Sequence, residues 1–266
     1  MIGPRRLFVV NRGLPSLNLS VIDLAVDGKT FTSLPPVPLH SGIWDVAVHQ
    51  ASNRAYVTRW PGTLYVIDTL ATDPAKLLVE AISAGKGILS MSVDQAANRI
   101  YLVRSVQPTL ERIELFDPVQ RTFTPLGVPN LPTRSQPFDL AFDPDGRLYI
   151  SNLGDTPAGS VAPNVTVVDL TADDVTSVRT TSGPWAVAID PERNQAYVPT
   201  AAGLELVTRS NHGGDPYSVM LRLSMGHFPV SVAVQPVSGE VYIGDHLDGS
   251  VRAAPAVDAS QMVAWH

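Results

Sequence analysis

The stretch Gly183–Val198, GPWAVAIDPERNQAYV, decides the fold. It holds two short apolar runs, WAVAI and QAYV, which are separated by the polar segment DPERN. Asp, Pro and Asn favour turns, whereas the flanking runs are rich in residues that favour β-strands. The stretch therefore predicts a strand, a tight turn and a second strand.

The same pattern recurs along the whole chain. Four further segments superimpose on the stretch: GIWDVAVHQASNRAYVTR from Gly42, GILSMSVDQAANRIYLVR from Gly87, QPFDLAFDPDGRLYISN from Gln136 and FPVSVAVQPVSGEVYIGD from Phe228. An aromatic residue opens the second strand of each unit, at Phe8, Tyr56, Tyr101, Tyr149, Tyr197 and Tyr242. Such regular spacing indicates an internal repeat of about 45 to 48 residues.

Each repeat continues with further apolar segments that predict a third and a fourth strand. The third strand is represented by VTVVDL and TLYVIDT, and the fourth by KLLVEAIS and YSVMLRLS. Repeats of this length with four strands each are typical of a β-propeller, whose small sheets bury their faces against one another. We therefore predict an all-β fold: one six-bladed β-propeller domain, residues 1–266, built from four-stranded antiparallel blades.

The two ends of the chain leave the first blade incomplete. Met1 aligns with the turn between the first and second strands of a blade, so the innermost strand is missing. The segment QMVAWH, residues 261–266, fits two interpretations. It is either the outermost strand of the last blade or the missing inner strand of the first, which would close the ring. A chain that is part of a longer one is the third interpretation.

Composition excludes several classes of function. The net charge of −6 argues against nucleic-acid binding, which needs clustered Lys and Arg. No apolar run reaches the roughly 20 residues that cross a bilayer, and the start of the chain lacks a signal-peptide pattern, so we expect no membrane insertion. The absence of cysteine removes disulfides and thiolate chemistry but does not fix the compartment.

The repeat also resembles a known family. GPWAVAIDPERNQAYV, and QPFDLAFDPDGRLYISN followed by VTVVDL, are similar to the bacterial YVTN-type propeller repeat. This resemblance covers essentially the whole chain and implies the propeller fold. Related propellers include lactonase-like and lyase-like enzymes as well as surface-layer proteins, so the resemblance implies no single activity. It points to the periplasm or the cell exterior as the location.

Ligand sites of propellers usually lie where the loops entering the inner strands meet the loops leaving the second strands. Residues that recur in register are expected to be scaffold, and those that break register are functional candidates. By this test the aspartates that end the third strands are structural, and their carboxylates are expected to accept N–H groups of the turn. They are Asp23, Asp68, Asp117 and Asp169.

One histidine-containing blade breaks register on this face. His227 precedes its inner strand, and Asp245 and His246 follow its second strand. An imidazole beside a carboxylate is suited to general base catalysis, so His227 and His246 are the candidate catalytic residues. The alternative is that both histidines are exposed loop residues. His40 is a third candidate here, whereas His49 and His212 are expected to be solvated at turns elsewhere.

A second group of residues is rich in oxygen. Carboxylate and amide oxygens from different blades suit a hard cation, Ca²⁺ or Mg²⁺. The arrangement loosely resembles that of gluconolactonase-like propellers, although a glutamate in that family's metal position has no clear counterpart. The predicted ligands are Asn11, Asp139, Asn152 and Asp245, with Asp45 as an additional candidate.

A third group is cationic and aromatic. Guanidinium groups converging on a pocket suit a carboxylate or phosphate, while a mixed-charge rim is the alternative. Trp44 and Trp185 recur in register, so packing between blades competes with ligand binding as their role. The predicted ligand-binding residues are Arg59, Trp60, Arg104, Arg134, Trp44 and Trp185, and Arg12 and Lys86 belong to the same face.

Two hypotheses of function follow. The first is a binding propeller that takes a small anionic molecule or a protein partner at its channel mouth. The alternative is a metal-dependent hydrolase or lyase, lactonase-like or streptogramin-lyase-like, in which the cation polarises a carbonyl and a histidine moves a proton. No organic cofactor is expected.

Overall fold

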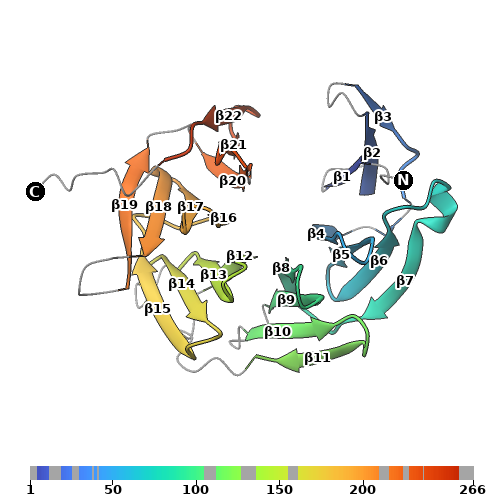
Figure 1. Ribbon diagram of the computed structural model, residues 1–266, viewed down its shortest axis with the longest axis horizontal. Helices are drawn as coiled ribbons and strands as arrows, with labels where there is room; N and C mark the ends of the chain where they lie inside the picture. The colour runs from blue at the N-terminus through green and yellow to red at the C-terminus, as the bar shows by residue number, and fades with distance from the viewer. Residues whose placement is uncertain are drawn as a thin grey trace, which may run out of the picture. The chain divides into compact units, whose positions relative to one another are not determined.

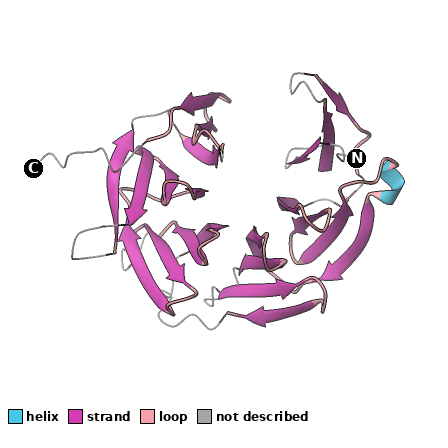
Figure 2. Ribbon diagram, viewed as in Figure 1, coloured by secondary structure: helices cyan, strands magenta, loops and turns pink. Residues whose placement is uncertain are grey.

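The computed structural model describes residues 5–11, 19–25, 30–37, 39–40, 42–104, 112–126, 136–154, 161–209, 216–223, 228–235 and 237–257. This part of the chain consists of 22 β-strands and one 3₁₀ turn, η1 (Pro74–Lys76), as Figure 2 shows. None of its helical segments is long enough to cross a membrane. The strands form six antiparallel sheets, so the protein is an all-β, six-bladed propeller, as predicted (Figure 1).

The contacts within the chain divide it into two compact units. The N-terminal unit contains blades 1 to 3. Blade 1 consists of β1 (Arg5–Val10), β2 (Leu19–Leu24) and β3 (Phe31–Ser33). Blade 2 consists of β4 (Ile43–His49), β5 (Arg54–Arg59), β6 (Thr63–Asp68) and β7 (Leu78–Ser83). Blade 3 consists of β8 (Ile88–Asp94), β9 (Arg99–Arg104), β10 (Arg112–Asp117) and β11 (Thr122–Pro125).

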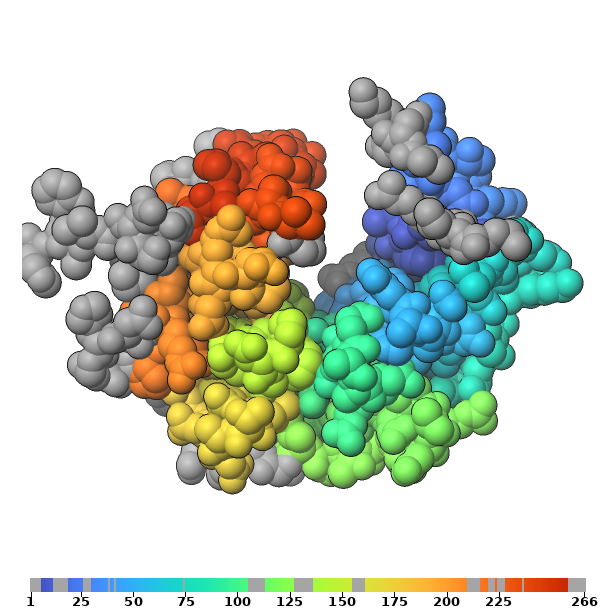
Figure 3. Space-filling view, in the orientation of Figure 1, coloured from blue at the N-terminus to red at the C-terminus, as the bar shows by residue number. Residues whose placement is uncertain are grey.

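The C-terminal unit contains blades 4 to 6, which pack directly on one another in Figure 3 as the yellow, orange and red layers. Blade 4 consists of β12 (Pro137–Phe142), β13 (Arg147–Asn152), β14 (Asn164–Asp169) and β15 (Asp174–Arg179). Blade 5 consists of β16 (Ala188–Asp190), β17 (Gln195–Thr200), β18 (Gly203–Arg209) and β19 (Tyr217–Leu223). Blade 6 consists of β20 (Pro229–Val234), β21 (Val241–Asp245) and β22 (Val251–Ala254).

The predicted four-strand pattern is therefore confirmed for blades 2 to 5, including the fourth strands β7 and β19. Blades 1 and 6 have three strands each within the described residues. Blade 1 begins with β1, the strand that carries Phe8, so no inner strand is described for it, in agreement with the sequence. The segment QMVAWH lies outside the described residues.

The core lies between adjacent blades, which bury the facing sides of their sheets. Successive side chains of a strand point to opposite faces. In blade 2, Val57 and Ile67 accordingly pack against blade 1, whereas Tyr56 and Val66 pack against blade 3. The same alternation joins blades 4, 5 and 6, with Tyr149 facing blade 5 and Tyr197 facing blade 6. In blades 2, 4 and 5 the recurrent aromatic residue is thus a packing element of the blade junction, whereas Tyr242 of blade 6 is exposed.

The aspartates that end the third strands are structural, as predicted. The Asp68 carboxylate accepts the N–H of Leu70, at 2.8 Å. Asp117 and Asp169 each accept two N–H groups of the turn that follows. Asp23 instead binds the guanidinium of Arg6 at 2.7 Å.

Candidate functional site

In the C-terminal unit, the inner strands begin beside the ends of the second strands. Pro137 pairs with Asn152, and Pro229 pairs with Asp245. Blade 5 repeats this arrangement through the bridge between Pro184 and Thr200. We call this side of the unit its top face and the opposite side its bottom face. The sequence prediction that these two loop positions share a face is confirmed within these blades.

A row of aromatic side chains crosses the top face of the C-terminal unit. The Phe138 and Trp185 rings, from blades 4 and 5, meet edge to face with centroids 5.3 Å apart. Trp185 also contacts Phe228, just before β20 of blade 6, at 5.7 Å. Phe228 in turn lies 6.4 Å from the ring of His246. We call these four residues the aromatic row.

The aromatic row is only partly covered. Its three apolar rings are half-buried, and His246 is exposed, as is the neighbouring Leu247. A half-buried aromatic ring keeps apolar surface in contact with water, which a flat ligand could cover. The row therefore combines packing between blades with a surface that can bind.

Asp245 holds the end of the row in place. One oxygen of its carboxylate accepts the Phe228 N–H at 3.0 Å, and the other accepts the N–H of Leu247 at 2.9 Å. The His246 N–H donates to the Phe228 carbonyl at 3.0 Å. Asp245 is buried, whereas the His246 side chain is exposed. The two adjacent side chains therefore lie in different environments, and the contacts of Asp245 are those of a positioning residue.

The roles predicted for the histidines remain predictions. His227 lies outside the described residues. His40 is exposed and belongs to the N-terminal unit. His49, predicted to be solvated, is instead buried: its ring nitrogens lie 2.6 Å from the Ser52 hydroxyl and 3.1 Å from the Gln95 carbonyl of blade 3. That prediction was wrong because the β4–β5 turn packs against the next blade.

Two of the predicted metal ligands link inner strands of adjacent blades. The Asp139 carboxylate accepts the N–H of Val187, from blade 5, at 3.0 Å. In the N-terminal unit, Asp45 binds the N–H of Met91 at 2.9 Å and the Ser90 hydroxyl at 3.1 Å in the same way. Both aspartates follow a bulge in the inner strand, and their own N–H donates to a hydroxyl of the second strand. The repeated geometry identifies an inter-blade clasp.

The amide side chains predicted to bind metal lie against the third strand. Asn11 donates to the Ser20 hydroxyl at 2.8 Å. The Asn152 amide group donates to Asn164 and to Thr166, each at 2.9 Å. The Asn152 Oδ1 atom is buried and accepts no hydrogen bond from the described residues, and the Ser182 hydroxyl has none either. Buried polar atoms without partners are uncommon in proteins.

The metal assignment of Asn11, Asp139, Asn152 and Asp245 stays a prediction. Asn11 belongs to the N-terminal unit and the other three to the C-terminal unit. Among the described residues, no three His, Asp or Glu side chains gather as metal ligands would. Asn152 Oδ1 has the chemistry of a Ca²⁺ ligand, but the carboxylates of Asp139 and Asp245 already bind backbone N–H groups.

The predicted cationic residues of the N-terminal unit have different surroundings. Arg104 is buried and binds the buried Glu114 at 2.5 Å, and it also donates to the Lys86 carbonyl. Lys86 and Trp60 are exposed, whereas Arg59 and Trp44 are half-buried. Arg12 and Arg134 lie outside the described residues. Glu114 balances the charge of Arg104 in a buried ion pair. The anion-binding role of Arg104 and of the other cationic residues stays a prediction.

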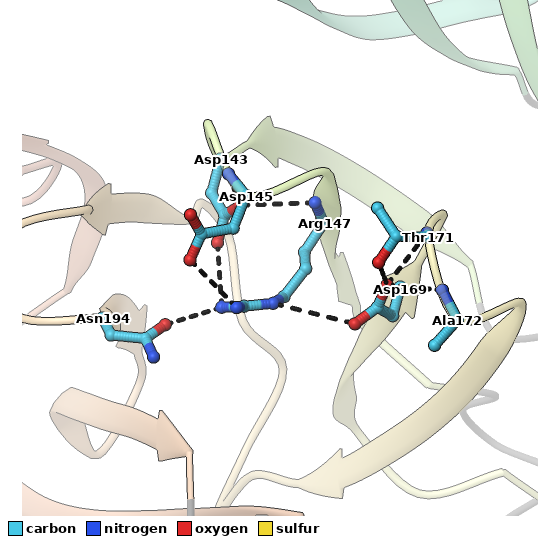
Figure 4. A network of polar contacts seen from close by, with 7 residues as sticks. All are labelled: Asp143, Asp145, Arg147, Asp169, Thr171, Ala172 and Asn194. Atoms are coloured by element: carbon cyan, nitrogen blue, oxygen red, sulfur yellow. Dashed lines mark hydrogen bonds and ion pairs between the residues drawn. The ribbon is translucent and has the colours of Figure 1, made fainter.

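The densest polar network lies on the bottom face of the C-terminal unit (Figure 4). The buried guanidinium of Arg147 donates to Asn194 of blade 5 at 2.6 Å, to Asp145 at 3.0 Å and to Asp143 at 3.3 Å. It also forms an ion pair with Asp169 at 3.9 Å. Burial raises the pKa of Asp143, whereas the Thr171 hydroxyl, followed by backbone N–H groups, lowers the pKa of Asp169.

Comparison with known proteins supports the fold alone. No protein-family model matches the sequence, and no curated protein matches it significantly. Many solved structures are similar. Hydrazine synthase from Kuenenia stuttgartiensis aligns with 15% identity and a TM-score of 0.71, over 95% of this chain and 81% of that one.

Two further structures show the same extent of similarity. A chain of the nidogen/laminin complex aligns with 16% identity and a TM-score of 0.65, over 95% of this chain and 89% of that one. A functionally unknown protein from Desulfotomaculum acetoxidans aligns with 14% identity and a TM-score of 0.64, over 90% of this chain and 75% of that one. At these identities the similarity shows the propeller fold and no activity, and the resemblance to YVTN-type repeats stays a prediction.

Sequence reasoning missed Phe138 and Phe228 as members of a site. A signal for Phe138 was present, because it occupies the repeat position of Trp44 and Trp185. Phe228 stands two residues before that position in its own blade, so the repeat did not point to it.

Proposed function

We propose that the protein is a non-catalytic ligand-binding propeller, and that its ligand lies on the aromatic row of blades 4 to 6. The observation that carries this proposal is the continuous contact of Phe138, Trp185 and Phe228 across three blades. Propellers commonly bind ligands where several blades converge. Here the residues that converge are half-buried rings rather than charged groups.

The chemistry of the row defines the ligand class. Edge-to-face and tilted rings present both faces and edges to an incoming molecule, so they favour a flat apolar or aromatic group. The exposed imidazole of His246, at the end of the row, can donate a hydrogen bond to an oxygen of the ligand. We therefore propose a small molecule that combines a flat ring with an oxygen acceptor, and a carboxylate would provide that acceptor.

Binding is better supported than the metal-dependent hydrolase or lyase. Proton transfer by His246 would benefit from a carboxylate that orients the imidazole. The neighbouring Asp245 instead binds the N–H groups of Phe228 and Leu247. The carboxylate thus supports the position of an aromatic side chain, which is what a binding surface requires.

The proposal is tested by ¹⁹F NMR on protein labelled with 5-fluorotryptophan. The chain contains four tryptophans, and the Trp185 signal is assigned with the Trp185→Phe variant. We expect 2-naphthoate to shift the Trp185 signal saturably. A parallel titration with 2-naphthylmethanol, which has the same ring without charge, measures the preference for an anion.

The location of the shift decides the outcome. A saturable change at Trp185 supports the aromatic row. A change confined to Trp44 or Trp60 would move the site to the N-terminal unit and contradict the proposal. No change at Trp185 with either naphthalene compound would contradict it as well.

A further inference from the structure

A cavity of about 320 Å³ lies between blades 2 and 3 of the N-terminal unit, whereas the aromatic row belongs to the C-terminal unit. Its apolar lining includes Val66, Ile82 and Phe116, and its polar lining includes Tyr56, Arg54 and Asn98. The volume is at the lower end of the range found for ligand pockets, roughly 300 to 1,000 Å³. A site for a small molecule is therefore possible by size.

The corresponding junction between blades 4 and 5 shows what normally fills this position. Arg147 and Asn194 stand at the repeat positions of Arg54 and Asn98. There, Arg147 crosses the junction and donates to Asn194 Oδ1 at 2.6 Å (Figure 4). At the junction of blades 2 and 3, Arg54 instead donates to the Asn53 carbonyl and pairs with Asp68 at 3.2 Å.

The consequence is an acceptor without a donor. Asn98 Oδ1 is buried and accepts no hydrogen bond from the described residues. An unsatisfied buried oxygen is unfavourable, so a group that donates to it gains affinity. Asn98 belongs to the lining of the cavity, so its amide oxygen is the acceptor that we assign to a ligand bound there.

A second substitution within the repeat removes an aromatic ring. Tyr217 is buried at the start of β19 and packs edge to face on Tyr149, with centroids 6.2 Å apart. The strand registers place Arg121 at the equivalent position before β11. The Arg121 side chain is 63% exposed and pairs with Glu80 at 3.0 Å. The space that a phenol fills in one junction is thus left to the cavity in the other.

The two guanidinium groups of the lining are both ion-paired, Arg54 with Asp68 and Arg121 with Glu80. The Arg121 side chain is 63% exposed, and a guanidinium has five N–H donors, so it can bind a ligand carboxylate besides Glu80. The exposed side chains of Val79 and Val119 extend the apolar lining outward. A ligand that complements this lining has an aromatic ring for Tyr56 and Phe116, an N–H or O–H donor for Asn98, and a carboxylate for Arg121.

We propose that this cavity is a second ligand site, specific for a small aromatic carboxylate that carries a hydrogen-bond donor. It is separate from the aromatic row and does not depend on the function proposed there. The missing donor and the missing ring of the junction are the two features that such a ligand replaces.

The test is a ¹H–¹⁵N NMR titration of the full chain with 4-aminobenzoate. We expect saturable shifts at the amides of Asn98 and Arg121, with a dissociation constant on the order of 1 mM. Benzoate, which lacks the donor, should bind about tenfold more weakly, as one lost hydrogen bond implies.

Two variants separate binding from folding. Asn98→Gly and Arg121→Gly both suit the positive φ of these positions, 52° and 59°, so neither strains the backbone. Asn98→Gly should remove the preference for 4-aminobenzoate over benzoate, while Arg121→Gly should weaken both ligands.

Three results would overturn the proposal. They are no saturable shift at these amides at about 10 mM ligand, roughly ten times the expected dissociation constant, an unchanged preference in Asn98→Gly, and shifts confined to blades 4 to 6. The last result would leave the aromatic row as the binding site, so failure here is distinguishable from failure there.

Discussion

Equivalent repeat positions make different contacts in two blade junctions, the one between blades 2 and 3 and the one between blades 4 and 5. In the second, Arg147 reaches Asn194 across the junction, and Tyr217 fills the space beside Tyr149. In the first, Arg54 stays on its own blade and Arg121 is exposed, which leaves a cavity and an unpaired Asn98 oxygen. The repeat therefore determines where two blades meet, but not whether side chains fill the space between them.

The largest effect is expected from breaking the filled junction. Arg147→Met removes a buried guanidinium and leaves Asp143 without its ion-pair partner. We expect the free energy of unfolding to fall by about 3 to 5 kcal/mol, measured by urea denaturation. The matched variant Arg54→Met affects a partly exposed pair and should cost less than about 1 kcal/mol. Equal losses in the two variants would contradict the comparison.

The next effect concerns the two asparagines. Asn194→Gly removes the acceptor for Arg147, and we expect a loss of about 1.5 to 3 kcal/mol because the donor is charged. Asn98→Gly removes an oxygen that has no hydrogen bond, so stability should change by less than about 0.5 kcal/mol. Both residues have positive φ, which glycine adopts without strain. Thermal unfolding of the pair measures the difference, and a costly Asn98→Gly would show that this oxygen has a partner.

A smaller effect tests the inter-blade clasp, which occurs once in each unit, at Asp45 and at Asp139. Asp45→Ala leaves the buried Ser90 hydroxyl and the Met91 N–H without their carboxylate, which should cost about 1 to 3 kcal/mol. Asp139→Ala removes the acceptor of the Val187 N–H and should cost a similar amount. Chemical denaturation gives both values. No loss in either variant would indicate that the clasp does not stabilise the blades.

The smallest expected effect is on how the free energy of unfolding decreases at low pH. The pKa of Asp169 is lowered, so its contribution is complete above the ordinary value of about 4 and is lost as pH falls through the lowered pKa. Asp143 has a raised pKa, so its protonation in acid offsets part of this loss. Asp169→Asn should flatten the decline of stability between about pH 5 and 2, and Asp143→Asn should steepen it, each by less than about 1 kcal/mol. The opposite order would refute these assignments.

The sequence predicted the blades well because their determinants are local. Strand, turn and spacing all follow from short patterns around residues such as Tyr56 and Tyr149, and the turn aspartates follow from the hydrogen bonds that their own carboxylates can make. Contacts between blades depend on side-chain directions across two sheets. For that reason the buried position of His49 and the inter-blade bond of Asp139 were not predicted.

The candidate site was predicted in part. Trp185 and His246 were chosen from the sequence, and the structure places both in the aromatic row. Phe138 and Phe228 were missed because an isolated aromatic residue at a strand end resembles an ordinary core residue. The cavity of blades 2 and 3 could not be predicted, since it arises from the direction that Arg54 and Arg121 take.

The binding of 2-naphthoate by Trp185→Ala tests the central claim most directly. We predict that the dissociation constant, measured by titration calorimetry, rises at least tenfold, a change of about 1.4 kcal/mol. Tyr242→Ala, which removes an exposed aromatic side chain of blade 6 outside the row, should leave the constant within about twofold. An unchanged constant in Trp185→Ala, or an equal loss in both variants, would contradict a binding site on the aromatic row.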